Sequence, residues 1–139
     1  MRLRLFAVGK PGGPNHLEAL TEYTRRLRPP YSLELLWPRT SAALREQTDR
    51  TRILLDERGT ELTSPELATW MERQRQKGSR QLDFCIGDAY GFTAEDRQAS
   101  TLVLALSRLT LPHRLAQLVL VEQLYRSYTI LTGHPYHHD

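Results

Sequence analysis

The segment LRLFAV (Leu3–Val8), followed directly by Gly9, decides the fold class of this chain. Apart from Arg4 all its residues are apolar, as is typical of a strand buried on both faces of a parallel sheet. After a loop of glycine and proline, apolar residues recur at helical spacing over Leu17–Leu27, until Pro29-Pro30 ends the pattern. A buried strand followed by an amphipathic helix is the beginning of an α/β domain.

Strand and helix patterns alternate along the rest of the chain. We expect four further strands, at Tyr31–Trp37, Arg52–Asp56, Leu82–Ile86 and Thr101–Leu106. Residue types that cap helices mark four helix starts, at Asn15, Ser41, Ser64 and Thr93. The last and longest helix is expected over His113–Thr132, ended by Gly133. This order predicts one domain over residues 1–139, an α/β fold with a mostly parallel five-stranded sheet and helices on both faces.

Composition places the chain among ordinary globular proteins, with 40% apolar and 25% charged residues. It contains no run close to the ~20 apolar residues of a membrane span, and its N-terminal apolar run is too short for a secretory signal. The single cysteine, Cys85, lies in an apolar run and is expected to be buried. A cytoplasmic location is the simplest expectation.

The basic residues are concentrated in the first third of the chain. Residues 1–40 carry seven Lys and Arg against three acids, including Arg25, Arg26 and Arg28 on one expected helix. Such a cluster fits contacts with RNA phosphates and fits a solvated helix face equally well.

The long last helix is apolar over more of its circumference than one sheet face can bury. A central helix enclosed within the monomer would explain this, but a domain this small offers few such places. We therefore expect a homodimer that covers the remaining apolar face.

Ligands of open parallel sheets bind beyond the carboxyl ends of the strands. Three loops follow such ends, at Glu57–Thr63, Gly87–Phe92 and Ser107–Pro112. None has a P-loop or dinucleotide-binding pattern. The middle loop, GDAYGF, is a plain turn or a place where a ligand approaches the backbone. The last loop has little charge and suits a flat neutral group such as adenine.

The chain ends in GHPYHHD, with three of its five histidines. From the residues alone this segment could be a frayed, disordered terminus or part of an active site. Because the histidines are terminal and interrupted by Pro135 and Tyr136, neither a metal site nor a purification tag is expected. The sequence also lacks G-x-S-x-G, H-E-x-x-H and C-x-x-C, so hydrolase, zinc-protease and redox functions have no support.

The last third, LTLPHRLAQLVLVEQLYRSYTILTGHPYHH (Leu109–His138), carries a long motif running from L-T-x-P-H through L-Y-R to Y-H. Shorter pieces are LRLFAVGK at the start, EYTRRL at Glu22–Leu27, LLD at Leu54–Asp56, SPELA at Ser64–Ala68, and Ile86-Gly87. With these motifs, which span nearly the whole chain, the sequence resembles the RlmH family of ribosomal large-subunit pseudouridine N3-methyltransferases, in the SPOUT class.

The resemblance implies a C-terminal trefoil knot, a homodimer, and S-adenosylmethionine as cofactor. Its substrate would be a pseudouridine in large-subunit rRNA of assembled ribosomes. The implied cofactor contacts are Leu55, Gly87, Leu106, Ser107, Arg108, Leu109, Thr110 and Leu111. They fall at the same three strand ends that the fold class selects.

The chain departs from the family pattern in three places. It has Gly87-Asp88-Ala89-Tyr90-Gly91 where the family usually shows Gly-Gly-x-x-Gly, and Asp88 could attract a sulfonium cation or simply lie in a turn. The region between Trp37 and Arg52 is shorter than usual, and the basic residue near the C-terminus is His138.

The N3 proton of the target base must leave during methyl transfer. Candidate acceptors are His137, His138 and His113, although His113 could instead pack at the start of its helix. Tyr136 is expected to stack on or orient the base. Arg114 and Arg126 are candidates for phosphate contacts or for ion pairs within the dimer, as Arg25 and Arg26 are for RNA.

Three functions remain open at this point. The first is an active rRNA methyltransferase. The second is a ribosome- or RNA-binding relative that no longer transfers methyl groups, and the third is a SPOUT methyltransferase acting on another RNA, such as tRNA.

Overall fold

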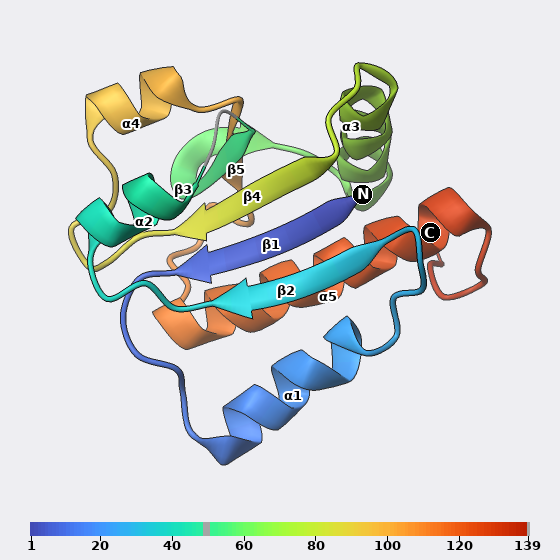
Figure 1. Cartoon of the computed structure of the whole chain (residues 1–139), viewed down its shortest axis with the longest axis horizontal. Helices are drawn as coiled ribbons and strands as arrows, with labels where there is room; N and C mark the ends of the chain where they lie inside the picture. Colours follow the sequence, from blue (N-terminus) through green and yellow to red (C-terminus); the bar gives the residue numbers. More distant parts are fainter. Residues whose placement is uncertain (49–50, 139) are drawn as a thin grey trace.

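A computed structural model describes residues 1–48 and 51–138 and shows one parallel sheet (Figure 1). Its strands, in the spatial order β2-β1-β4-β3-β5, are all paired in parallel. Their bounds are β1 Arg2–Ala7, β2 Ser32–Leu36, β3 Arg52–Glu61, β4 Gln81–Ile86 and β5 Leu102–Ala105. The predicted five-stranded α/β fold is confirmed, and the trefoil knot stays a prediction.

In the described part of the chain a helix follows each strand: α1 Pro14–Thr24, α2 Ser41–Gln47, α3 Ser64–Gln76, α4 Ala94–Ala99 and α5 His113–Thr132, the last of which ends the fold. Thr93 caps α4 as expected, with Asp96 completing a capping box. The capping residues predicted for α2 and α3 were wrong by one position, because Thr40 and Thr63 accept the backbone N–H bonds.

The predicted bounds of α1 were also wrong. Gly13 rather than Asn15 precedes its first turn, and Pro14 occupies the first helical position. The helix ends at Thr24, well before Pro29-Pro30, although Leu27 is still buried in the core. The ends of α5 and the left-handed Gly133 (φ 76°) agree with the prediction.

Helices cover both faces of the sheet, as expected. On one face α1, α3 and α5 pack together over a large apolar core that includes Leu5, Phe84 and Leu124. On the other face a smaller core around Phe6 and Leu54 is covered by Leu44 of α2 and by Phe92, just before α4. Cys85 lies in this second core, and burial raises the pKa of its thiol, so it is the buried apolar residue that was predicted.

Strand β3 is longer than the sequence pattern suggested. It continues to Glu61, so the loop expected at Glu57–Thr63 is largely strand, with an irregular register against β5 between Leu55 and Thr60. Gly59 allows the close approach, because a Cβ there would lie 2.6 Å from the carbonyl oxygen of Val103. The chain therefore bulges beside the carboxyl end of the sheet.

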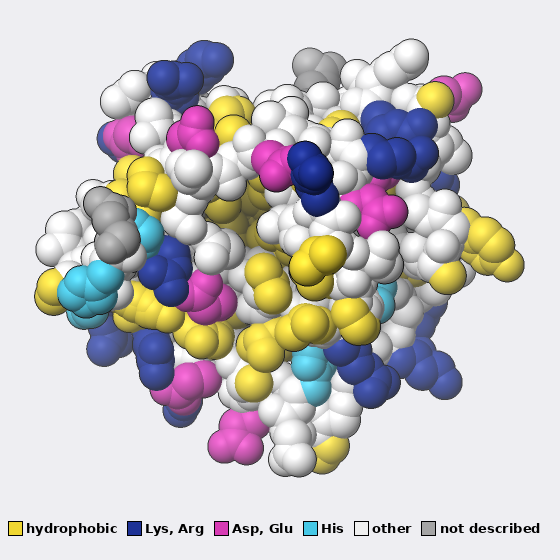
Figure 2. All heavy atoms as spheres, turned by 180° about the vertical axis from the view of Figure 1, so that it is seen from behind, with side chains coloured by type: hydrophobic (Ala, Val, Ile, Leu, Met, Phe, Trp, Pro, Cys, Tyr) yellow, Lys and Arg dark blue, Asp and Glu magenta, His cyan; other side chains and the backbone are white. Residues whose placement is uncertain are grey.

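Helix α5 lies behind the strands in Figure 1 and faces the viewer in Figure 2. Hydrophobic side chains form a band across the middle of that face (Figure 2). On α5, Leu115 is 45% exposed, and Leu118 and Val119 are only partly buried. Across the described residues, no helix is both long and apolar enough to cross a membrane.

Candidate active site

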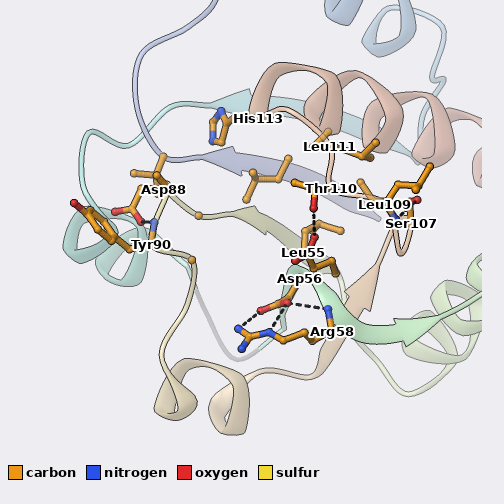
Figure 3. A pocket seen from close by; sticks show the side chains of 18 residues that line it. Leu55, Asp56, Arg58, Asp88, Tyr90, Ser107, Leu109, Thr110, Leu111 and His113 are labelled. Atoms are coloured by element: carbon orange, nitrogen blue, oxygen red, sulfur yellow. Dashed lines mark hydrogen bonds and ion pairs between the residues drawn. The ribbon is translucent and has the colours of Figure 1, made fainter.

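The irregular stretch of β3 from Leu55 and the carboxyl ends of β4 and β5 line an open cavity of about 810 Å³ against the first turn of α5 (Figure 3). Seven of the eight residues that the resemblance implied for the cofactor line it: Leu55, Gly87, Leu106, Ser107, Leu109, Thr110 and Leu111. The eighth, Arg108, is not part of the lining and lies 3.8 Å from Glu61 in an exposed ion pair. The cofactor role of these residues stays a prediction, but the fold brings them together.

The wall from β3 carries two carboxylates. Asp56 accepts hydrogen bonds from the backbone and the guanidinium of Arg58, which lower the pKa of Asp56 and keep it ionised (Figure 3). Glu57 accepts a 2.9 Å hydrogen bond from the hydroxyl of Thr110, which ties the bulge of β3 to the loop after β5. These contacts fix the width of the cavity between two strand ends.

The loop after β4 is built as a turn. Asp88 accepts a 2.9 Å hydrogen bond from the backbone N–H of Tyr90, and Gly91 takes a left-handed conformation (φ 71°). Asp88 nevertheless lines the cavity, and Tyr90 beside it is 96% exposed. Gly87 is packed so closely against Phe92 that a Cβ would lie 3.2 Å from its ring. Asp88 therefore lies in a turn, as one alternative expected, and it also lines the cavity. Its attraction of a sulfonium cation stays a prediction.

The loop after β5 presents mostly backbone and apolar side chains. Ser107 accepts a 2.9 Å hydrogen bond from the backbone N–H of Leu109, which holds the loop in a compact turn. Leu109 itself is 76% exposed at the rim. Because Arg108 is not part of the lining, the face of this loop toward the cavity carries little charge and suits a flat heterocycle held by backbone hydrogen bonds, as the sequence suggested.

His113 stands at the first turn of α5 and lines the cavity (Figure 3). Burial lowers the pKa of His113, which favours the neutral imidazole. Its Nδ1 lies 3.0 Å from the side-chain amide nitrogen of Gln117, one turn further along the helix. His113 is therefore packed at the helix start and exposed to the cavity at the same time.

The C-terminal tail folds back onto the other end of α5. The hydroxyl of Tyr136 donates a 2.9 Å hydrogen bond to Glu122, and its ring meets the ring of Tyr125 edge-on at 4.7 Å. Arg126 donates to Nδ1 of His137 at 3.0 Å and lies over the ring of Tyr136. Burial and the bond to Glu122 raise the pKa of Tyr136 to about 12, so its hydroxyl stays protonated at neutral pH. The tail of this chain is ordered, but it lies at the opposite end of α5 from the cavity (Figure 1).

The arginines considered for RNA lie in two places. Arg25 and Arg26 both pair with Glu22, and Arg26 lies over the ring of Tyr125, beside the tail. Arg126 pairs with Glu122, whereas Arg114 is exposed next to His113. No group of three His, Cys, Asp or Glu residues within the described chain could hold a metal ion.

Sequence reasoning missed two residues of these clusters. Glu122 anchors the tail, and Gln117 contacts His113 from inside the protein. Their spacing along α5 was a usable signal, since Gln117 follows His113 by four residues and Glu122 precedes Arg126 by four. Their contacts with residues far away along the chain, such as Trp37 for Gln117, could not be predicted from the sequence.

The family described as "Predicted SPOUT methyltransferase" matches residues 1–137. The chain belongs to the SPOUT methyltransferase family. As a member of this family it is a methyltransferase, in agreement with the resemblance seen in the sequence.

Several relatives carry the name "Ribosomal RNA large subunit methyltransferase H". The protein of Geobacter sp. (strain M21) is 40% identical over 154 residues, covering all of both chains. That of Koribacter versatilis is 42% identical over 144 residues, with 99% of this chain and 98% of the relative covered. That of Erythrobacter litoralis is 43% identical over 138 residues, with 99% and 98% covered.

The region between Trp37 and Arg52 was expected to be short, and the lengths of these alignments differ. An alignment of 154 positions against a SPOUT methyltransferase of 139 residues leaves fifteen positions without a counterpart here. The relative from Erythrobacter litoralis aligns over 138 residues and is thus close to this chain in length. The stretch retains α2, and residues 49–50 lie outside the described residues.

Proposed function

We propose that this SPOUT methyltransferase uses S-adenosylmethionine to methylate N3 of a pseudouridine in large-subunit ribosomal RNA. The observation that carries the proposal is the cavity at three parallel strand ends, in a chain that matches a methyltransferase family along its length. The names of the relatives support the class of RNA, and the resemblance supports the pseudouridine and the assembled ribosome.

The residues of the cavity fit this cofactor. Its volume of about 810 Å³ lies in the range of small-molecule sites, and the uncharged lining residues of Leu106–Leu111 suit the adenine. Asp88 and Glu57 bring negative charge, which suits the positively charged end of the molecule. S-adenosylmethionine supplies an electrophilic methyl group on its sulfonium sulfur. The protein then has to hold the cofactor so that its methyl group lies in line with N3 of the target base, because this alignment gives much of the rate.

The tail acts on the cavity of a partner subunit in this proposal. Helix α5 has 20 residues and is therefore about 30 Å long, with the cavity at its first turn and the tail packed on its C-terminal half, from Glu122 onward. Tyr136, held to Glu122, cannot reach the cavity of its own chain without leaving these contacts. If two copies of α5 pack antiparallel around Leu115, Leu118 and Val119, the C-terminal half of each lies beside the partner's cavity.

Within this arrangement the tail residues take different roles. Tyr136 is protonated and can donate a hydrogen bond or stack on the base, but it is no proton acceptor near neutral pH. His137 already accepts a hydrogen bond from Arg126 through Nδ1. His138 is exposed, so it can take the N3 proton directly or through water without breaking a contact of the tail. Arg26 and Arg126 lie over the rings of Tyr125 and Tyr136, and Arg25 shares Glu22 with Arg26, so these arginines are the candidates for RNA phosphates near the tail.

Calorimetry with S-adenosylmethionine tests the donor half of this proposal. We expect saturable binding by the full-length protein, weakened in an Asp88→Asn variant, because the amide lacks the negative charge that faces the cavity. Absence of heat at high micromolar cofactor would support the alternative of an RNA-binding relative without activity, for which Asp88 is the motivating residue.

Mass spectrometry of the RNA tests the acceptor half. Ribosomes from a strain that lacks the gene are incubated with the protein and cofactor, with purified tRNA from the same strain as a parallel substrate. One added methyl group on a pseudouridine of the large-subunit RNA is expected, and none on tRNA. Methylation of tRNA alone would favour the third function named above.

A further inference from the structure

Gln117 connects the cavity to the interior of the protein. It is 1% exposed and lies on α5, one turn beyond His113. Its Oε1 lies 3.2 Å from the indole nitrogen of Trp37 and 3.3 Å from Nε2 of His16. Its amide nitrogen lies 3.0 Å from Nδ1 of His113. Three ring nitrogens from three parts of the chain therefore meet one buried amide.

Trp37 fixes the orientation of that amide. An indole N–H can only donate a hydrogen bond, so the Gln117 atom that faces it must be the carbonyl oxygen. The NH2 group then points at Nδ1 of His113 and donates to it. Because Nδ1 accepts a hydrogen bond, it carries no proton, and in the neutral ring the proton is on Nε2.

The Nε2 atom of His113 is buried beside the cavity. Within the described residues it makes no hydrogen bond of ordinary geometry, although the nearby carbonyl of Gly87 favours a proton at this position. A buried N–H donor without a good partner costs free energy, and a ligand acceptor would relieve that cost.

Charging this ring is unfavourable. A second proton on Nδ1 would meet the amide hydrogens of Gln117, and burial of the ring acts in the same direction. Of the charged and titratable groups that face the ring, Asp88 favours the imidazolium, whereas Arg114 and His16 oppose it. A ring that already carries its proton on the cavity side is a hydrogen-bond donor and a poor proton acceptor.

We propose that Gln117 is a positioning residue that holds His113 as the neutral Nε2–H tautomer, and that His113 donates a hydrogen bond to an acceptor atom of the methyl donor in the cavity. This replaces the expectation that His113 takes the N3 proton. Only the identity of the ligand rests on the proposed function. The state of the ring follows from contacts within the chain.

The tautomer can be measured without any ligand. Long-range proton–nitrogen NMR of the ¹⁵N-labelled full-length protein distinguishes a protonated Nε2 from a protonated Nδ1. We expect His113 to carry the proton on Nε2, and to stay neutral at a pH below ~6.5, where an ordinary histidine gains its charge. A proton on Nδ1 or an imidazolium at pH 7 in the wild type would overturn the proposal.

Gln117→Glu gives a near-isosteric test of the cause. The carboxylate can accept from both Trp37 and His113, so we expect Nδ1 of His113 to become protonated and the ring to titrate at higher pH. Gln123→Glu, the same change on the same helix away from His113, is the matched control and should leave the His113 signals unchanged. An unchanged His113 spectrum in folded Gln117→Glu would contradict the role of Gln117. If that variant fails to fold, the wild-type spectrum still decides the tautomer.

Two substitutions of His113 separate a donor from a base. In His113→Gln the terminal amide takes the place of Nε2 and can donate a hydrogen bond, but it cannot accept a proton. We expect this variant to keep most of its turnover and cofactor affinity, and His113→Phe to bind S-adenosylmethionine about tenfold more weakly. If both variants lose turnover equally and keep their affinity for the cofactor, His113 acts as the proton acceptor and not as a hydrogen-bond donor. A wild-type protein that binds no S-adenosylmethionine would overturn the proposed function, while the ligand-free NMR result would still stand.

Discussion

One ion pair, between Arg45 and Asp96, links the two small helices α2 and α4 on the second face of the sheet. Arg45 of α2 donates two hydrogen bonds of 2.8 and 2.9 Å to the largely buried carboxylate of Asp96 in α4. These bonds lower the pKa of Asp96 well below its usual range. Asp96 also caps α4, so one carboxylate links two elements behind the loop Gly87–Phe92. A substitution of Asp96 should therefore also shift the backbone of that loop, which lines the cavity.

We predict that Asp96→Asn lowers the free energy of unfolding by about 1–2 kcal/mol at pH 7, since Arg45 is partly exposed and its pairing is screened. Because the folded pKa lies below the unfolded value of ~3.9, the contribution is present above that pH and is lost as the pH falls. Urea titrations at pH 7 and pH 3 should show the difference between the proteins shrinking in acid. Exposed Glu46→Gln should stay within ~0.5 kcal/mol of wild type. A difference that persists undiminished at pH 3 would contradict an ionic origin.

At the scale of an element, the tail after Gly133 packs on the C-terminal half of α5, where Tyr136 bonds to Glu122 and His137 to Arg126. We predict that truncation after Gly133 leaves the dimer and cofactor binding nearly intact. Methyl transfer should fall at least ~10²-fold, because a positioning or acid–base group is lost. Single-turnover methylation of ribosomes and light scattering measure the two effects.

Point variants of the tail assign the loss to particular residues. Tyr136→Phe keeps the ring contact with Tyr125 and removes the hydroxyl, so it separates stacking by the ring from hydrogen bonding to Glu122 or to the base. His138→Ala and His137→Ala then separate a proton acceptor from a residue held by Arg126. Wild-type methylation by the truncated protein would show that the tail has no part in the site.

For the whole molecule, the exposed apolar side chains of α5 and the position of the tail both point to a second copy. We predict by light scattering about twice the chain mass of 16.1 kDa, and a monomer for Val119→Glu, since a buried unpaired charge would disfavour association. Leu120→Glu is unsuitable for this test, because Leu120 is 0% exposed within the monomer and a charge there would disrupt the core. A native monomer at micromolar concentration would contradict the dimer.

Mixing two inactive variants tests whether the site is shared. If the tail of one subunit serves the cavity of the other, a tail-truncated protein mixed with a variant whose cavity no longer binds the cofactor should regain activity in the mixed dimer. Each mixed dimer then holds one intact cavity beside one intact tail. Lack of recovery despite demonstrated subunit exchange would place tail and cavity in the same chain.

The sequence by itself determined the order of strands and helices along the chain, the five-stranded sheet and two of the three loops expected at the cavity. The third, Glu57–Thr63, is largely strand. These features depend on local signals: the apolar run of Leu3–Val8, the capping pair of Thr93 and Asp96, and the left-handed glycine that ends α5. Loops after parallel strands gather at one edge of the sheet by topology alone, so Leu55, Gly87 and Leu106 could be grouped before any coordinates.

Only the tertiary structure decided features that depend on contacts between distant residues. The length of β3 depends on Gly59 meeting the backbone of Val103, and no local pattern encodes that approach. The tautomer of His113 depends on Trp37, which lies 80 residues from Gln117 along the chain and reaches its carbonyl through the fold. The tail pattern indicated a functional end, yet its place far from its own cavity follows from the length of α5 and the anchor at Glu122. A sequence specifies local conformation through neighbouring residues, whereas the partners of a buried polar group are set by packing.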